Sequence, residues 1–238
     1  MDDLPRLIVT PVRRGEHFAT DSAIHAATYL SGTALTRTDG SVVDFPHHTY
    51  IIHNEIVLPG QYDGNPDMWA RNRQDLWTAA DNSEKWVKSA TLAREFLGWF
   101  PKELPTESLP DIGRQFAKFL ADRYQAAVDF AVDHKKGKAH FHALMTARRV
   151  TSEGLGRVAF SPESHGRPLE NGKWQSDEAD WREIRGEWGN ILNAALSEKV
   201  RSASVATWRT ARQEAGARSA PIAEHDGPKS GGRDHPEI

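Results

Sequence analysis

Two predicted strands joined by a short turn constrain this chain more than any other feature. Ala127–His134 has the alternation of a strand, Ala139–Thr146 is an apolar run that carries two histidines, and Lys135-Lys136-Gly137-Lys138 lies between them. Alternation with a period of two is typical of a half-buried strand, and a glycine-containing break between two such runs indicates a hairpin. We therefore expect an antiparallel hairpin in the middle of a sheet.

This hairpin carries a His–hydrophobe–His triplet, His140-Phe141-His142. Successive side chains of a strand point to opposite faces, so both imidazoles share one face, about 7 Å apart. A hairpin closing at the lysine–glycine turn is expected to bring His134 alongside them. Three imidazoles with open coordination positions are suited to a catalytic metal. The alternative is an ordinary polar strand face, which such a pair of histidines often is.

Composition limits the kind of site that this chain can build. Its 238 residues include no cysteine, which excludes disulfides and thiolate metal sites, so a metal must be held by histidines and carboxylates. No apolar run is long enough to cross a membrane, and the acidic start Met1-Asp2-Asp3 is unlike a signal peptide. The net charge of −3 disfavours a broad basic coat for nucleic acid but not a local basic groove.

Hydrophobic periodicity predicts the other elements in outline. A helix is expected from Thr20 or Asp21 to Tyr29 or Leu30, ending at Gly32, and Ala90–Phe100 is open between helix and strand. The remaining expectations are strands at Leu7–Val12 and Tyr50–Leu58, a hairpin at Ala34–Phe45 turning at Asp39-Gly40, helices at Asn65–Asp81, Leu109–Tyr124 and Asp177–Val200, and polar strand or loop at Arg148–Phe160.

Strands joined mostly by hairpins, together with long helices, predict an α+β fold with a central, mostly antiparallel β-sheet and helices packed on it. We expect one domain over residues 1–200. Residues 201–238 are expected to form a polar tail, because the apolar pattern weakens from Arg201, and Ala217–Ile238, rich in glycine, proline, serine and charge, is expected to be disordered.

Six ordered blocks of the sequence resemble the MobA/MobL plasmid mobilisation relaxases, which belong to the HUH endonuclease superfamily. The resemblance covers about residues 5 to 200. The blocks that carry it are the N-terminal strand, S-A-I-H-A-A-T-Y-L-S-G at Ser22–Gly32, H-N-E-I-V-L-P at His53–Pro59, L-A-R-E at Leu92–Glu95 followed by Glu103-Leu104-Pro105, H-F-H-A-L-M-T-A-R at His140–Arg148, and W-R-E-I-R-G-E-W-G-N-I-L-N-A-A-L at Trp181–Leu196.

The resemblance implies a DNA relaxase that nicks one strand at a plasmid origin of transfer and later rejoins it. Tyr29 would be the nucleophile and would form a 5′-phosphotyrosyl intermediate, with Mg²⁺ or Mn²⁺ held by His134, His140 and His142. Implied partners are single-stranded origin-of-transfer DNA, accessory mobilisation proteins and a type IV secretion coupling protein. The implied location is the bacterial cytoplasm, with no membrane insertion.

Further candidates surround these residues. Glu55 and Glu95 are candidates for a base or for a carboxylate that orients a histidine, and His25, one turn before Tyr29, is a candidate for the same role on the phenol. Surface or packing roles remain open for all three. Five basic residues are candidate contacts to the DNA backbone, with a solvated turn as the alternative: Lys135, Lys136, Lys138, Arg148 and Arg149.

Two other functions remain open, the first of them because of departures from the family pattern. Thr28 is inserted in the small-residue run, Leu30 stands where the family often has arginine, and the His134-to-His140 gap is two residues short. A catalytically impaired, relaxase-derived DNA-binding or regulatory protein is one alternative. A rolling-circle replication initiator is the other, but its tyrosine is expected after the triplet, and Phe141–Ile238 contains none.

Overall fold

The structure, a computed structural model, describes residues 6–14, 22–46, 49–83, 90–160 and 177–218, with backbone alone for 203–218. Residues up to Ser197 form one compact unit and Glu198–Ile238 a second. The elements in chain order are β1 (Leu7–Arg13), α1 (Ala23–Ser31), β2 (Leu35–Thr36), β3 (Val42–Val43), β4 (Ile51–Val57), η1 (Gly60–Tyr62), η2 (Trp69–Arg71), α2 (Arg73–Ser83), β5 (Thr91–Trp99), η3 (Thr106–Ser108), α3 (Leu109–Tyr124), β6 (Val128–Lys135), β7 (Lys138–Thr146), β8 (Arg148–Thr151), β9 (Gly154–Val158) and α4 (Asp177–Arg218).

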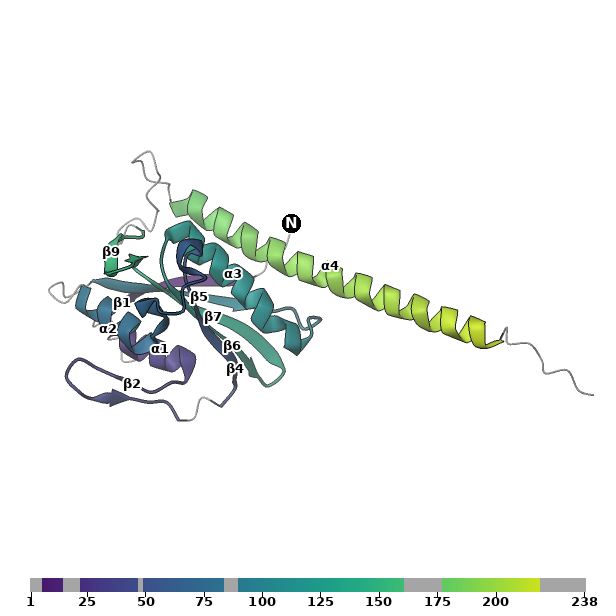
Figure 1. Cartoon of the computed structure of the whole chain (residues 1–238), viewed down its shortest axis with the longest axis horizontal. Coiled ribbons are helices and arrows are strands. Elements are labelled where there is room, and N and C mark those ends of the chain that lie inside the picture. The colour runs from purple at the N-terminus through teal and green to yellow at the C-terminus, as the bar shows by residue number, and fades with distance from the viewer. Residues whose placement is uncertain (1–5, 15–21, 47–48, 84–89, 161–176, 219–238) are drawn as a thin grey trace, which may run out of the picture. The chain divides into compact units, whose positions relative to one another are not determined.

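A five-stranded antiparallel sheet in the order β1-β5-β7-β6-β4 forms the centre of the first unit (Figure 1). Helices pack on both of its faces, which confirms the predicted α+β class. α1 and α2 bury their small and apolar side chains on one face of the sheet. On the other face, α3 and the start of α4 enclose an aromatic core that includes Phe116, Phe130, Phe141 and Trp188.

The β6–β7 hairpin forms where the sequence predicts it, and its turn sets the register. Lys136 and Gly137 both have positive φ, 51° and 76°, which is the conformation of a two-residue turn whose twist suits a hairpin. Lys135 consequently pairs with Lys138, and Asp133 pairs with His140. All the residues that share a face across this hairpin follow from that pairing.

Several boundaries differ from the predicted ones. The open segment Ala90–Phe100 is a strand, β5, and the helix expected from Asn65 begins as α2 only at Arg73. Ser22, rather than Thr20 or Asp21, caps α1. The predicted end of the last helix at Val200 is wrong, because α4 continues to Arg218 and makes the first part of the expected tail helical.

The polar segment after β7 folds back as the small β8–β9 hairpin. The loop expected before α4 and the last part of the tail, residues 161–176 and 219–238, lie outside the described residues. Among the residues that the structure describes, no helix is both long enough and apolar enough to cross a membrane.

Candidate functional site

The candidate nucleophile projects from α1, a short helix fixed at both ends. The Ser22 hydroxyl accepts a hydrogen bond from the His25 amide, and Gly32 ends the helix with a positive φ of 65°. Asp81 at the end of α2 accepts hydrogen bonds from the first amides of α1, the shorter one 2.7 Å from Ala23. Most of the helix is buried, but the Tyr29 side chain is 46% exposed. The backbone is thus fixed while the phenol remains accessible.

Thr28, the inserted residue, is accommodated inside the helix packing. Its side chain is fully buried, and its hydroxyl donates a hydrogen bond to the Ile24 carbonyl at 2.9 Å. Tyr29 and His25 both contact the Phe45 ring, at 5.4 and 5.2 Å between centroids. Arg37 lies 3.1 Å from His25 Nδ1. His25 and Tyr29 thus share a contact with the same ring, Phe45. The expected role of His25 in orienting the phenol stays a prediction.

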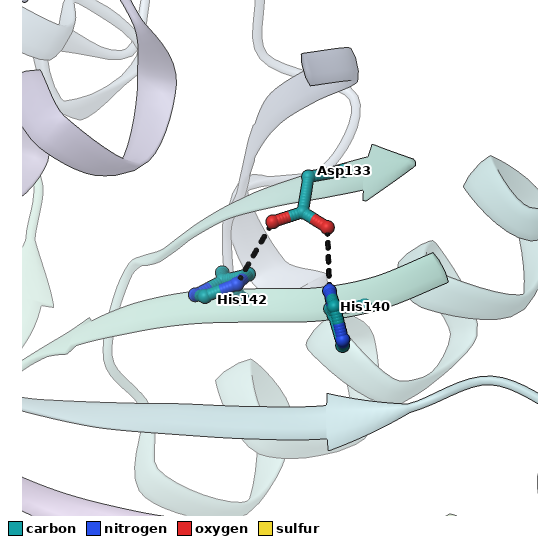
Figure 2. A group of neighbouring side chains, drawn as sticks. All are labelled: Asp133, His140 and His142. Atoms are coloured by element: carbon teal, nitrogen blue, oxygen red, sulfur yellow. Dashed lines mark hydrogen bonds and ion pairs between the residues drawn. The ribbon is translucent and has the colours of Figure 1, made fainter. Parts of the chain in front are cut away.

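A carboxylate joins the two histidines of the triplet near the turn of the β6–β7 hairpin (Figure 2). Asp133 Oδ1 lies 2.7 Å from His140 Nδ1, and Asp133 Oδ2 lies 3.1 Å from His142 Nε2. The strands explain the geometry, since Asp133 pairs directly with His140 and His142 lies two residues farther along β7. We call Asp133, His140 and His142 the triad.

The triad and Tyr29 line one cavity of about 230 Å³. α1 contributes Tyr29 and Leu30, so the helix holds the phenol over the sheet face that carries the triad. Lys135 also lines the cavity, and its Nζ lies 4.4 Å from the centre of the Tyr50 ring. We call this space the first cavity; the rest of its lining is Tyr50, Ile51, Leu97, Trp99 and Ala131.

Burial and the neighbouring carboxylates perturb the titrating groups of the first cavity. Burial is the largest influence on His142 and lowers its pKa, but Asp133 and Glu95 outweigh it and raise the pKa to about 9. Burial raises the pKa of Asp133, yet its bonds to His142 and His140 hold that pKa below the usual range. Burial raises the pKa of the Tyr29 phenol, as do Tyr50 and the carboxylates, and Lys135 opposes them. The phenol therefore needs a positive charge nearby to ionise near neutral pH.

The two candidate carboxylates fall on opposite faces of the sheet. Glu95, on β5, has Oε1 3.8 Å from His142 Nδ1, the ring nitrogen that faces away from Asp133. Glu55 instead contacts Arg114 of α3 at 2.7 Å and His53 at 3.2 Å. Glu55 does not line the first cavity. The structure thus brings Glu95 to the triad and keeps Glu55 away from it.

The prediction that the hairpin brings His134 alongside the other two histidines is wrong. His134 pairs with Ala139, one residue out of phase with the Asp133–His140 pair, so its side chain belongs to the opposite face. There it lines a different cavity. Asp133 is not among the metal ligands predicted from the sequence, although the Lys136-Gly137 turn carries a signal that identifies it. A two-residue turn at those positions fixes the pairing that places Asp133 opposite His140.

The basic candidates are scattered. Lys135 lines the first cavity, Lys138 lines the one that contains His134, and Lys136 is at the turn. Arg148 and Arg149 belong to β8, beyond the end of β7 that lies opposite to the triplet. Arg148 donates a hydrogen bond to the Gly156 carbonyl at 3.0 Å. These arginines do not flank the triad as expected, and contact with DNA stays a prediction for all five residues.

The triad has the donor set of a divalent-metal site. It offers two imidazole nitrogens and one carboxylate oxygen, and these atoms all lie within 4.8 Å of one another. Exchanging the expected third imidazole for the carboxylate of Asp133 makes the set harder, which suits Mg²⁺ or Mn²⁺ better than three imidazoles would. An imidazole must release its proton to bind a metal, so binding at His142 is coupled to proton release.

A family model matches most of the chain, and two curated proteins are similar to it. The sequence model of the MobA/MobL family matches residues 21–231. A mobilization protein MobL of Acidithiobacillus ferridurans is 28% identical over 227 residues, covering 84% of this chain and 56% of that protein. A probable conjugal transfer protein TraA of Sinorhizobium fredii is 22% identical over 213 residues, covering 82% of this chain and 19% of that protein. The chain therefore spans about half of the first relative and about a fifth of the second.

A solved structure shares the fold. Its chain comes from a study of the molecular basis of vancomycin resistance transfer in Staphylococcus aureus. The TM-score is 0.65 at 21% sequence identity, with 82% of this chain and 94% of that chain covered. At this identity the likeness establishes the arrangement of helices and strands.

Proposed function

Because the chain belongs to the MobA/MobL family, we propose that it is a relaxase that cleaves and rejoins one DNA strand at an origin of transfer. The observation that carries the proposal is that Tyr29 and the triad line the same cavity. A two-histidine, one-carboxylate set also suits other metal chemistry, including that of iron oxygenases. An accessible phenol beside the set is what favours transfer of a phosphoryl group.

In the proposed reaction, Tyr29 Oη attacks the scissile phosphorus. A bond forms between Oη and phosphorus, the bond from phosphorus to the 3′ oxygen breaks, and that oxygen takes up a proton. The products are a 5′-phosphotyrosyl linkage and a free 3′-hydroxyl. The phenolic proton leaves to water in the open cavity, and the Lys135 charge stabilises the phenolate. Because one ester replaces another, the 3′-hydroxyl can reverse the step and rejoin the strand.

A divalent ion, Mg²⁺ or Mn²⁺, would bind the phosphate oxygens and offset the charge that develops on them. Asp133, His140 and His142 would hold this ion. Glu95 would accept a hydrogen bond from the far nitrogen of His142 and fix the orientation of the ring. Glu55 has no part in this proposal, since its carboxylate pairs with Arg114 on the other face.

The proposed partners follow from the reaction and from the names of the relatives. Single-stranded origin-of-transfer DNA is the substrate. One relative is named a mobilization protein and another a probable conjugal transfer protein, which supports assembly with accessory mobilisation proteins and a type IV secretion coupling protein.

A covalent-adduct assay tests the proposal. The chain is incubated with overlapping single-stranded oligonucleotides that cover the origin-of-transfer region of its own replicon, with Mn²⁺ or with EDTA, and the products are separated on a denaturing protein gel. We expect a protein–DNA band that requires Mn²⁺ and disappears in Tyr29→Phe. Tyr50→Phe is the matched control, because it removes the same hydroxyl from another tyrosine of the same cavity.

Each other outcome has a defined meaning. A band that survives Tyr29→Phe and disappears in Tyr50→Phe would move the nucleophile to Tyr50. If the chain binds the DNA but gives no band with any metal, the alternative of a DNA-binding protein without nicking activity replaces the relaxase.

A further inference from the structure

A second cavity of about 250 Å³ lies beside the base of α3 and the tip of the β6–β7 hairpin. His134, Lys138 and Ala139 of the hairpin line one side of it. Its remaining lining residues come from the end of β5 and the segment that leads into α3, namely Trp99, Phe100, Pro101, Lys102, Leu104, Thr106 and Leu109, together with the turn residue Gly137. We call it the second cavity, and the proposed reaction does not use it.

The second cavity has an apolar floor and a basic rim. Phe100, Leu104 and Leu109 are buried and form the floor. Lys102 and Lys138 are exposed, and no aspartate or glutamate is among the described residues that line this space. An apolar surface next to two cations fits a ligand with a flat apolar part and an anionic part. A nucleotide has that composition.

Trp99 lines both cavities and connects them. Its ring meets the ring of His140 edge-on, 5.7 Å between centroids, and the Arg6 guanidinium lies 4.5 Å from the ring centre. The hairpin also places the two cavities next to each other. Asp133 and His140 face the first cavity, while their chain neighbours His134 and Ala139 line the second. A strand held at the triad has only to pass the hairpin tip to reach the second cavity.

We propose that the second cavity binds a nucleotide of the cleaved strand close to the scissile phosphate, with its base on the apolar floor and its phosphate on the basic rim. This inference rests on the proposed function, since it uses the same strand. Lys102 and Lys138 pair with the phosphate, and an imidazole N–H of His134 donates a hydrogen bond to it. His134, a metal ligand in the prediction from sequence, is a DNA contact in this proposal.

The test compares the effect of a lysine substitution on DNA affinity across DNA strands of different length. Binding is measured by fluorescence anisotropy in a Tyr29→Phe background, so that no strand is cut, with origin-of-transfer oligonucleotides shortened one nucleotide at a time from either end. We expect Lys138→Gln to weaken binding of the full-length strand by about tenfold, as for loss of a charged hydrogen bond. Once the nucleotide in the second cavity is removed, Lys138→Gln and Lys138 proteins should bind equally.

Lys136→Gln is the matched control, because Lys136 lies two residues away in the same turn but lines neither cavity. Its effect should be smaller and the same at every DNA length. For single strands, losing one phosphate contact should also reduce the slope of log K against log salt by about 0.7 in Lys138→Gln. Thermal unfolding of both variants checks that the fold is intact.

Two results would overturn the inference: a loss in Lys138→Gln that is equal at every DNA length, or one no larger than the loss in Lys136→Gln. Either would leave the second cavity to a ligand other than DNA. The adduct assay on the unsubstituted chain reports separately on the proposed function. If the adduct forms but the effect of Lys138→Gln does not depend on DNA length, only the inference about the second cavity is wrong. If that effect depends on DNA length but no adduct forms, only the proposed nicking activity is wrong.

Discussion

The same strands β5, β7 and β6 present two unlike faces. Near the start of β7, one face holds Asp133, His140 and His142, whose polar atoms bond to one another at an open cavity. The other face is closed by aromatic side chains, with the Phe141 ring 5.5 Å from both Phe116 and Trp188. Consecutive residues of one strand thus lie in different environments, one in the polar cavity and the next in the buried aromatic core.

Neighbouring residues of β7 are therefore expected to affect different properties of the protein, one the proposed reaction and the next the free energy of unfolding. A substitution on the triad face should change metal binding and DNA cleavage while leaving the packing intact. A substitution on the aromatic face should change the free energy of unfolding.

His142→Ala should lower the yield of covalent adduct on the order of a thousandfold, as expected when the stabilisation supplied by a metal at the phosphate is lost. Its free energy of unfolding, measured in urea with EDTA present at a pH above about 9, should change by less than about 1 kcal/mol, because His142 has then lost the proton that favours its pairing with Asp133 and Glu95, and its side chain lines the cavity rather than the core. An adduct yield that stays near the parent level and still depends on Mn²⁺ would remove His142 from the metal site.

Phe141→Ala, one residue earlier, should do the reverse. Phe141 is fully buried in the aromatic core, and such truncations cost about 3–5 kcal/mol. Urea unfolding measures the loss, and Mn²⁺ affinity of the protein that remains folded should match the parent's. If unfolding were unchanged while Mn²⁺ binding disappeared, the two faces would not be independent.

How far the sequence alone could anticipate this contrast depends on what kind of information each part needs. Strand and helix periodicity is local, so the hairpin, the histidine face and the helix of Tyr29 were predicted correctly. The partner of a strand is not local. Glu55 was a candidate because its strand is clear, but the face it occupies depends on pairing with β6. The prediction of His134 in place of Asp133 has another cause. The register set by the two-residue turn is local information, and it is enough to place Asp133 opposite His140.

Gly98→Ala tests how tightly the aromatic face is packed. A Cβ at this position would lie 2.8 Å from Cζ2 of the buried Trp188, so we expect a loss of about 1–3 kcal/mol. Gly186→Ala is the matched control, since a Cβ there meets nothing within 4 Å and the residue is helical. It should stabilise the protein by about 0.5–1 kcal/mol. Equal effects of the two substitutions in thermal or urea unfolding would contradict close packing at Gly98.

Glu95→Gln sharpens the comparison on the triad face. In the proposed site the Glu95 carboxylate orients His142 from 3.8 Å and does not bind the metal itself. Losing such a partner typically costs 10- to 100-fold, here expected in Mn²⁺ affinity. Isothermal titration with Mn²⁺ measures it, and saturating Mn²⁺ should restore most of the adduct yield. A defect that excess Mn²⁺ does not restore would show that Glu95 acts in the reaction itself.

Glu55→Gln makes the same chemical change on the other face and should have the smallest effect. Burial alone would raise the pKa of Glu55, but Arg114 and His53 outweigh it and hold the pKa below its usual value. Ionised Glu55 therefore stabilises the fold above the carboxyl pKa of the unfolded chain, and this contribution fades as pH falls through the lower pKa of the folded state. Because the side chain is 34% exposed, solvent screening should keep the difference from the parent under about 1 kcal/mol at neutral pH.

Unfolding measured in urea from neutral to acidic pH should show the free energies of the two proteins converging at low pH, with equal adduct yields at neutral pH. A fall in adduct yield comparable to that of Glu95→Gln would mean that the aromatic face does not isolate Glu55 from the triad.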